Sequence, residues 1–239
     1  MPADIADASP SKTYVEMPTR PLMGWVVASL WLGIAAGTVI LIADLLYLEA
    51  VLAWRESDLT GTEVEPLFGW GWIRSYYEII TITGAIIFYL VAIILPLLLL
   101  NRISAALHAR GVPVKMTPRW LVVWFFIPIA NLWKPYQGVR ELWIASDPAA
   151  TGGQGAPTLL KIWWALWLIP LLFSVLALIS LFDQSIAPDD ADGGYGLINT
   201  LLAISTGITD IGFFIAFIFV LRRLEERLQH GSALTEVFR

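Results

Sequence analysis

The sequence has no cysteine and few charged residues. Asp, Glu, Lys and Arg make up 15% of its 239 residues, and apolar residues make up 57%. Soluble domains carry about 25% charged and about 45–50% apolar residues, so a soluble globular enzyme and a disordered chain are excluded. Without cysteine there is no disulfide framework, thiolate nucleophile or thiolate metal site. The net charge of −5 argues against a nucleic-acid partner, which needs a basic surface.

Recognisable catalytic motifs are also missing. The two histidines, His108 and His230, are isolated, and no metalloprotease, serine-hydrolase, Walker or dinucleotide-binding pattern occurs. An intramembrane protease with two aspartates would need them close together, and we place Asp44 and Asp210 at different depths. We therefore predict that the chain is not an enzyme and has no catalytic residue, metal site or cofactor.

Four long apolar stretches dominate the sequence instead. Each is long enough to cross a hydrocarbon core, which takes roughly 20 residues. They cover about 22–48, 79–101, 162–182 and 197–221. A fifth stretch, 120–133, is apolar over only 14 residues, which fits a re-entrant or interfacial segment better than a crossing.

These lengths predict an all-α polytopic membrane protein. It has four transmembrane helices and one short re-entrant or interfacial helical hairpin over about 119–147. The expected organisation is a flexible cytoplasmic tail over 1–20, a single membrane domain over 21–229 and a C-terminal tail over 230–239.

The basic residues predict the orientation. With four crossings, 13 of the 15 Lys and Arg residues lie on the side of both termini, and only Arg55 and Arg74 lie on the other side. If 120–133 also crossed, the division would be 6 against 9. Because Lys and Arg collect on the cytoplasmic side of membrane proteins, four crossings with both termini in the cytoplasm are favoured.

The segment from Pro118 to Pro148 has the most distinctive sequence, PRWLVVWFFIPIANLWKPYQGVRELWIASDP. Pro128 and Pro135 predict a break in the helix at 129–134. Beyond the break, one helical face carries Tyr136, Val139, Trp143 and Ser146, and other faces carry Gln137, Arg140, Glu141 and Ile144. This pattern predicts a helix–break–helix hairpin entering from the cytoplasm, with a second arm lying flat at the interface as the alternative.

Two roles of this hairpin stay open. In the first, its Trp and Arg side chains only anchor it to the lipid headgroups. In the second, the hairpin forms part of a polar site, because irregular backbone at membrane depth must be buried in protein or line a water-filled cavity.

Asp210 lies near the middle of the fourth apolar stretch. A charged side chain at the bilayer centre costs at least about 2.5–3.5 kcal/mol, so it normally faces a partner or a cavity. We expect Lys134 to be this partner, with Arg140 as the alternative, because the hairpin tip and Asp210 are predicted at similar depths. The competing interpretation is an Asp that merely holds helices together. The candidate site consists of Asp210, Lys134, Arg140, Asn131, Tyr136, Gln137 and Glu141.

The first apolar stretch contains a pattern of small residues and one acidic residue. Ser29, Gly33 and Gly37 repeat every four residues, as in close helix–helix contacts in membranes. We expect them to pack within the chain rather than against a second copy. Asp44 lies towards the outer end of the stretch, where we expect a solvated interfacial side chain.

The string FIPIANLWKPYQGVRELWIASDP, residues 126–148, resembles the signature of the bacterial integral membrane family catalogued as domain of unknown function 4328. That family has a similar FIPxxNLxRPYQxxRELWxxS block between hydrophobic helices. Lys134 stands where the family usually has Arg, so the cation is kept and bidentate geometry is lost. The resemblance covers about 75–225 and implies a helical protein of a bacterial cytoplasmic membrane, but no activity. The matching residues are Pro128, Asn131, Leu132, Pro135, Tyr136, Gln137, Arg140, Glu141, Leu142, Trp143 and Ser146.

Two hypotheses about function follow. The first is a non-enzymatic membrane module whose hairpin and Asp210 form a polar site that binds or passes a small ligand, a lipid or an ion. The second is a membrane scaffold or assembly protein that acts through its loops, with the hairpin as a structural anchor. The lipid bilayer is the partner that the sequence requires, whereas a second copy of the chain and another membrane protein stay open.

Overall fold

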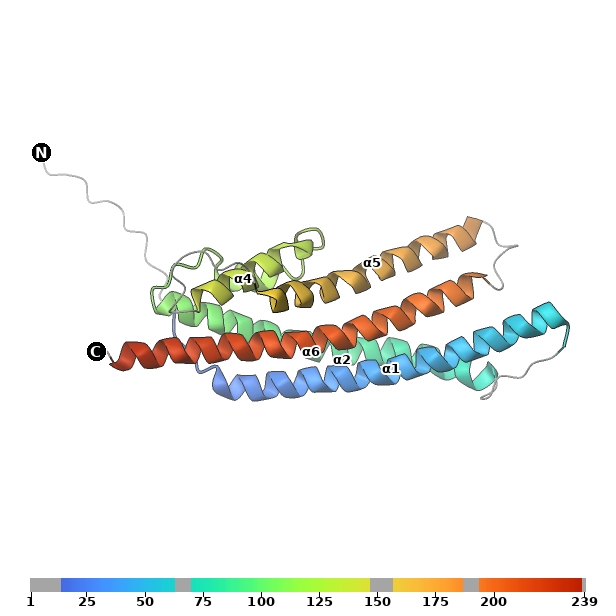
Figure 1. Ribbon diagram of the computed structural model, residues 1–239, viewed down its shortest axis with the longest axis horizontal. Helices are drawn as coiled ribbons and strands as arrows, with labels where there is room; N and C mark the ends of the chain where they lie inside the picture. Colours follow the sequence, from blue (N-terminus) through green and yellow to red (C-terminus); the bar gives the residue numbers. More distant parts are fainter. Residues whose placement is uncertain (1–13, 63–69, 147–156, 187–193, 238–239) are drawn as a thin grey trace, which may run out of the picture.

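The computed structural model describes residues 14–62, 70–146, 157–186 and 194–237, and every regular element in these ranges is a helix (Figure 1). The long helices are α1 (Arg20–Thr60), α2 (Trp70–Ala109), α5 (Thr158–Ile186) and α6 (Gly194–Val237). The short ones are α3 (Pro118–Val123), the 3₁₀ helix η1 (Ala130–Leu132) and α4 (Lys134–Ala145). The prediction of an all-helical fold is confirmed for the described residues.

Each long helix contains a stretch that is apolar and long enough to cross a membrane. These stretches are Arg20–Thr60, Ala92–Ala109, Thr158–Ile179 and Leu197–His230. The prediction of a multi-pass membrane protein with four candidate crossings is therefore confirmed for the described part of the chain. The helices also run past the predicted stretches. α1 alone has 41 residues, about 60 Å at 1.5 Å per residue, against a hydrocarbon core of about 30 Å.

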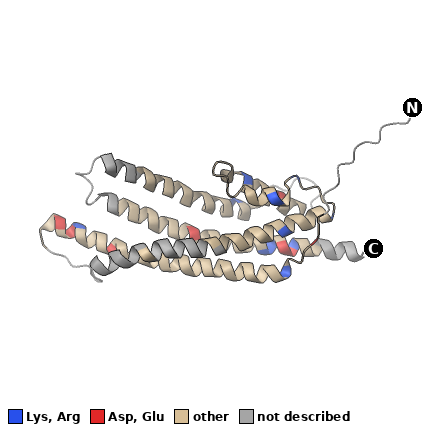
Figure 2. Cartoon of the chain, turned by 180° about the vertical axis from the view of Figure 1, so that it is seen from behind, with Lys and Arg blue, Asp and Glu red and all other residues tan. Residues whose placement is uncertain are grey.

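The four long helices lie side by side along the long axis of the molecule (Figure 1). α1 packs against α2 and α6, and α6 also packs against α5. The start of α1, the end of α2, the start of α5 and the end of α6 all lie at one end, with α3 and α4 beside them. We call this the basic end, because most of the Lys and Arg residues gather there (Figure 2).

The small residues of α1 face other helices of the same chain. Ser29, Gly33 and Gly37 are all buried. A Cβ atom on Gly33 would lie 3.2 Å from Cβ of Ala92 in α2 and 3.3 Å from the Phe214 ring in α6. The close approach of α1 to both neighbours thus depends on glycine at this position.

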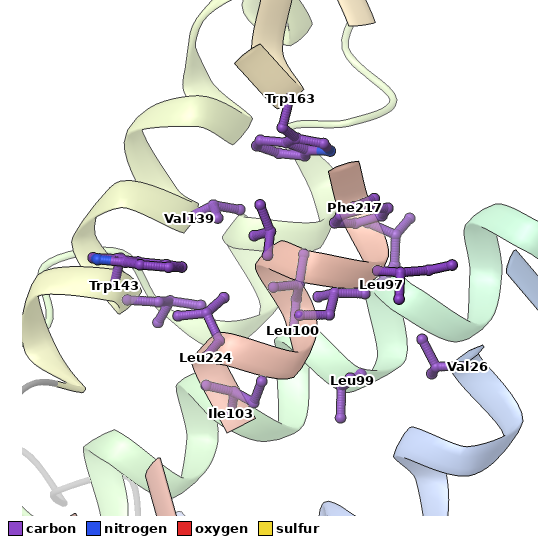
Figure 3. Packing of buried hydrophobic residues seen from close by; sticks show 14 of the residues in the cluster. Val26, Leu97, Leu99, Leu100, Ile103, Val139, Trp143, Trp163, Phe217 and Leu224 are labelled. Carbon is purple, nitrogen blue, oxygen red and sulfur yellow. The ribbon is translucent and has the colours of Figure 1, made fainter. Parts of the chain in front are cut away.

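The described hydrophobic core lies towards the basic end, where all six α-helices contribute side chains, some of which are drawn in Figure 3. The Trp163 ring lies 5.1 Å from the Phe217 ring, centroid to centroid. Because lipid tails are as apolar as these side chains, close packing rather than the hydrophobic effect holds such helices together. α4 is part of this core and not a free arm. The fully buried members include Val26, Leu100, Val139, Trp163 and Leu224.

The residues just before α1 are packed against the bundle. The Tyr14 ring lies 4.9 Å from the His108 ring, and Glu16 forms an ion pair with Arg110. Arg102 Nη1 donates a hydrogen bond of 3.1 Å to the Pro18 carbonyl. The predicted flexible tail over 1–20 therefore differs from the structure at residues 14–19, while 1–13 lie outside the described residues.

The other end of the chain also differs from the expected tail. α6 continues as a helix through Val237, whereas the membrane domain was predicted to end at 229. Its charged C-terminal part packs against the segment before α1, because the Thr19 hydroxyl donates a 3.5 Å hydrogen bond to the buried carboxylate of Glu225.

Replacement of Gly33 by Leu tests the packing of α1. A large side chain there must push Ala92 or the Phe214 ring aside, and such overpacking typically costs about 1–3 kcal/mol. We expect Gly33→Leu to lower the thermal unfolding midpoint of the purified protein, followed by tryptophan fluorescence. Gly24→Leu is the matched control, because a Cβ at Gly24 meets no atom within 4 Å. Equal midpoints for the two variants would contradict this packing.

Candidate functional site

The predicted hairpin is a pair of short helices with an irregular turn between them. α3 starts at Pro118, which follows an extended Thr117 and suits the first turn of a helix because its missing N–H has no helical partner there. α3 is only 6 residues long, about 9 Å, too short to cross a membrane. The break covers 124–133 and so begins earlier than the predicted 129–134. α4 then starts at Lys134, with Pro135 in its first turn.

α4 has the two faces that its sequence predicts. The buried side carries Val139, Leu142 and Trp143, whereas Gln137 and Arg140 are exposed. Ser146, at the end of the helix, is buried as well, and Tyr136 is partly buried.

Gly138 brings α4 unusually close to α3. A Cβ at this position would overlap Cδ1 of Leu121 in α3 and lie 2.8 Å from the sulfur of Met116. Only a residue without a side chain permits this approach unless Leu121 and Met116 move. The short spacing places the exposed face of α4 beside α3 and the loop that precedes it.

A cleft of about 760 Å³ lies between the loop after α2, α3 and the exposed face of α4. Among the described residues, its polar lining combines three cations, one carboxylate, one amide and one hydroxyl. These belong to Lys115, Lys134, Arg140, Glu141, Gln137 and Thr117. Its aromatic lining consists of Trp120 and Trp124, whose ring centroids lie 5.1 Å apart.

Glu141 fixes the loop that forms one wall of the cleft. Its carboxylate accepts hydrogen bonds from the backbone N–H groups of Lys115 and Met116, the second at 3.1 Å. Charge-assisted hydrogen bonds of this kind are stronger than those between neutral groups. The carboxylate therefore orders the loop that carries Lys115.

Lys134 extends over an aromatic ring of the same cleft. Its Nζ lies 5.6 Å from the centroid of Trp124, within the range of a cation–π interaction. Among the described residues, no ion pair joins Lys134 to Asp210. The prediction of this pair therefore gains no support, since the Lys134 ammonium lies over the ring of Trp124, the residue directly after α3.

The predicted site residues thus separate into two groups. Lys134, Gln137, Arg140 and Glu141 line the cleft. Tyr136 instead packs on α5, with its ring 6.0 Å from that of Trp164.

Asn131 lies in η1, outside the cleft lining. Its side-chain oxygen is buried and accepts no hydrogen bond from the described part of the chain. Sequence reasoning did not assign Lys115, Trp120 and Trp124 to the site, although all three lie within a few residues of the hairpin start.

Asp210 lies in α6, near the contact with α1, and there the structure corrects two expectations about Asp44. Asp44 is 2% exposed, so the prediction of a solvated interfacial side chain is wrong. Its carboxylate oxygen lies 3.9 Å from the Cβ position of Gly207 in α6, and Gly207 precedes Asp210 by less than one turn. The prediction that the two aspartates differ in depth is therefore also wrong. The reason is that α1 continues as a helix to Thr60, well beyond Asp44.

Metal binding has no support in the described ranges, where no group of three His, Asp or Glu side chains could hold an ion. The fold is that of a helical membrane protein with four candidate crossings. A basic, tryptophan-lined cleft lies beside the helix bundle. The chain belongs to the family described as "Domain of unknown function (DUF4328)", whose model matches residues 74–226. This confirms the resemblance drawn from the hairpin sequence. The match covers α3, η1, α4 and the whole cleft lining, and it leaves α1 outside.

No curated protein and no solved structure matches the chain significantly. The family assignment carries no activity with it, so the function has to be inferred from the site.

Substitution of Glu141 by Ala tests the order of the cleft wall. The two N–H groups that it binds would lose a charged acceptor, at a cost of about 1–2 kcal/mol for partly exposed groups. We expect the amides of Lys115 and Met116 to exchange hydrogen for deuterium about tenfold faster. Glu226→Ala is the control, since Glu226 is exposed and pairs with Arg223 on the surface of α6. Unchanged exchange in Glu141→Ala would show that the loop does not depend on Glu141.

Proposed function

We propose that the chain is a non-enzymatic, multi-pass protein of a bacterial cytoplasmic membrane, and that the cleft between α3 and α4 binds a small ligand at the cytoplasmic surface. The observation that carries this proposal is the cleft lining. Four polar side chains of the hairpin motif meet there with Lys115 and two tryptophans. Binding sites are typically concave and largely apolar, with a few well-placed polar groups.

The distribution of charge supports this orientation. Lys and Arg gather at the end where α1 starts and α6 ends (Figure 2), and such an excess marks the cytoplasmic side of membrane proteins. The cleft lies at the same end. Both termini and the cleft therefore face the cytoplasm in this proposal.

The exposed side chains of the hairpin support a re-entrant position. The turn between α3 and α4 presents Phe126, which is 66% exposed, and Ile129, which is 73% exposed. In water these apolar groups would be unfavourable, whereas lipid tails accommodate them. We therefore place the turn in the cytoplasmic leaflet, with its apolar tip towards lipid.

The cleft lining favours binding over catalysis. Glu141, the one carboxylate among the described lining residues, is engaged by backbone N–H groups, and the other charged groups of that lining are cations. Such a set can hold and orient an anion, but it offers no general base.

A substitution that fills the cleft without changing its charge tests the proposal. Gln137 is exposed and lines the cleft, so Gln137→Trp blocks the space while leaving the buried face of α4 intact. We expect the wild-type protein, purified in mild detergent, to carry a bound ligand in native mass spectrometry and Gln137→Trp to lose it.

Thr158→Trp serves as the control, because Thr158 is exposed at the start of α5 and lies outside the cleft. It should keep the ligand at wild-type occupancy. An adduct of equal occupancy in all three proteins, or in none, would contradict the proposal and favour the scaffold function.

A further inference from the structure

The cleft carries an excess of positive charge that the described part of the chain does not neutralise. Lys115, Lys134 and Arg140 face one carboxylate, Glu141, which is bonded to backbone N–H groups. Within the described ranges, no ion pair involves any of the three cations. Cations grouped in one concave site attract an anion, and an Arg guanidinium together with ammonium groups is a common arrangement for binding phosphate.

The same cleft has an apolar wall. Trp120 is 50% exposed and Ile144 is 39% exposed, and both line the cleft together with Trp124. The cationic and the apolar groups thus lie side by side in one space. A ligand that satisfies both carries a negative head and an apolar body.

The position of α4 places the cleft at the boundary between lipid and water. Near its start, the Tyr136 ring contacts the Trp164 ring, which lies in the apolar stretch of α5. Near its end, the Trp143 ring lies 4.5 Å from the guanidinium carbon of Arg227. Arg227 lies six residues, about 9 Å along the helix, beyond Leu221, the last residue of the fourth apolar stretch predicted from the sequence. α4 therefore runs from the apolar zone into the polar one, at the depth of lipid headgroups.

We infer that the ligand of this cleft is an anionic phospholipid of the cytoplasmic leaflet, with its phosphate held by Lys134, Arg140 and Lys115 and its acyl chain against the tryptophans. This inference rests on the proposed function and names the chemical class of the ligand. The charge complementarity and the boundary position carry it, because basic pockets on the cytoplasmic side of membrane proteins select anionic headgroups.

Titration of defined lipids tests the inference. The full chain is stripped of lipid in detergent and titrated with phosphatidylglycerol or with zwitterionic phosphatidylcholine, and binding is measured by native mass spectrometry. We expect about tenfold tighter binding of phosphatidylglycerol to the wild type. The double variant Lys134→Gln with Arg140→Gln should lose this preference.

Two control variants distinguish a loss of binding in the cleft from the effects of lower net charge and of misfolding. Arg222→Gln with Arg223→Gln removes the same charge from exposed positions of α6 and should keep the preference. Lys134→Arg keeps the cation and should keep it as well. If the wild type shows no preference, or if the α6 variant loses it as fully as the cleft variant, the inference is wrong.

A soluble phosphate is the other source of the same headgroup chemistry. Glycerol 3-phosphate lacks the acyl chains and their apolar contact with the tryptophans, so it should compete with the lipid only at concentrations about 100-fold higher. Equal competition would overturn the assignment to a lipid. The proposed function and the lipid assignment can be tested independently of each other. If Gln137→Trp loses a bound ligand that is not an anionic phospholipid, the binding site stands and only the lipid assignment falls.

Discussion

Backbone hydrogen bonding through the turn of the hairpin is the condition on which the rest of the site depends. Irregular backbone at membrane depth is tolerated only when its polar groups are satisfied or buried in protein. Here the N–H groups of Phe125 and Phe126 bond to carbonyls three residues earlier, and Asn131 bonds back to Ile127 at 2.7 Å. Leu132 and Trp133 continue the series. The turn can therefore lie at the edge of the hydrocarbon, where a longer loop without such bonds would be unstable.

The docking of α4 follows from this turn and determines the chemistry of the cleft. The apolar face of α4 is buried in the bundle core, as Val139 and Trp143 show in Figure 3. With that face occupied, the polar face of α4 is left beside α3, at the close approach that Gly138 permits. Lys134 and Arg140 then share one cleft with Lys115. The burial of the apolar face of α4 thus brings together the cations that the proposed lipid ligand requires.

The features that sequence reasoning predicted are those encoded in local patterns. The length of the apolar stretches predicted four helices that are long and apolar enough to cross a membrane, and Pro128 and Pro135 predicted the break. The spacing of apolar side chains predicted the buried face of α4. The family was also recognisable from the hairpin alone, since its motif is contiguous.

What could not be predicted depends on contacts between distant segments. The burial of Asp44 arises because α1 passes Gly207 of α6 at that level, and nothing near Asp44 in the sequence reports this. The expected Lys134–Asp210 pair was inferred from depth alone, whereas the structure places the Lys134 ammonium over the Trp124 ring. Lys115 reaches the cleft from a loop whose backbone N–H groups bind Glu141, 26 residues further along the chain.

The most direct test of the account is the membrane side on which the cleft lies. The chain lacks cysteine, so Thr62→Cys, Arg119→Cys and Arg223→Cys each introduce a single, exposed thiol. These can be labelled with an impermeant maleimide in intact cells and in inverted membrane vesicles. The account predicts labelling of Thr62→Cys in intact cells only, and of Arg119→Cys and Arg223→Cys in inverted vesicles only. Labelling of Arg119→Cys in intact cells would place the cleft outside the cytoplasm and contradict the account.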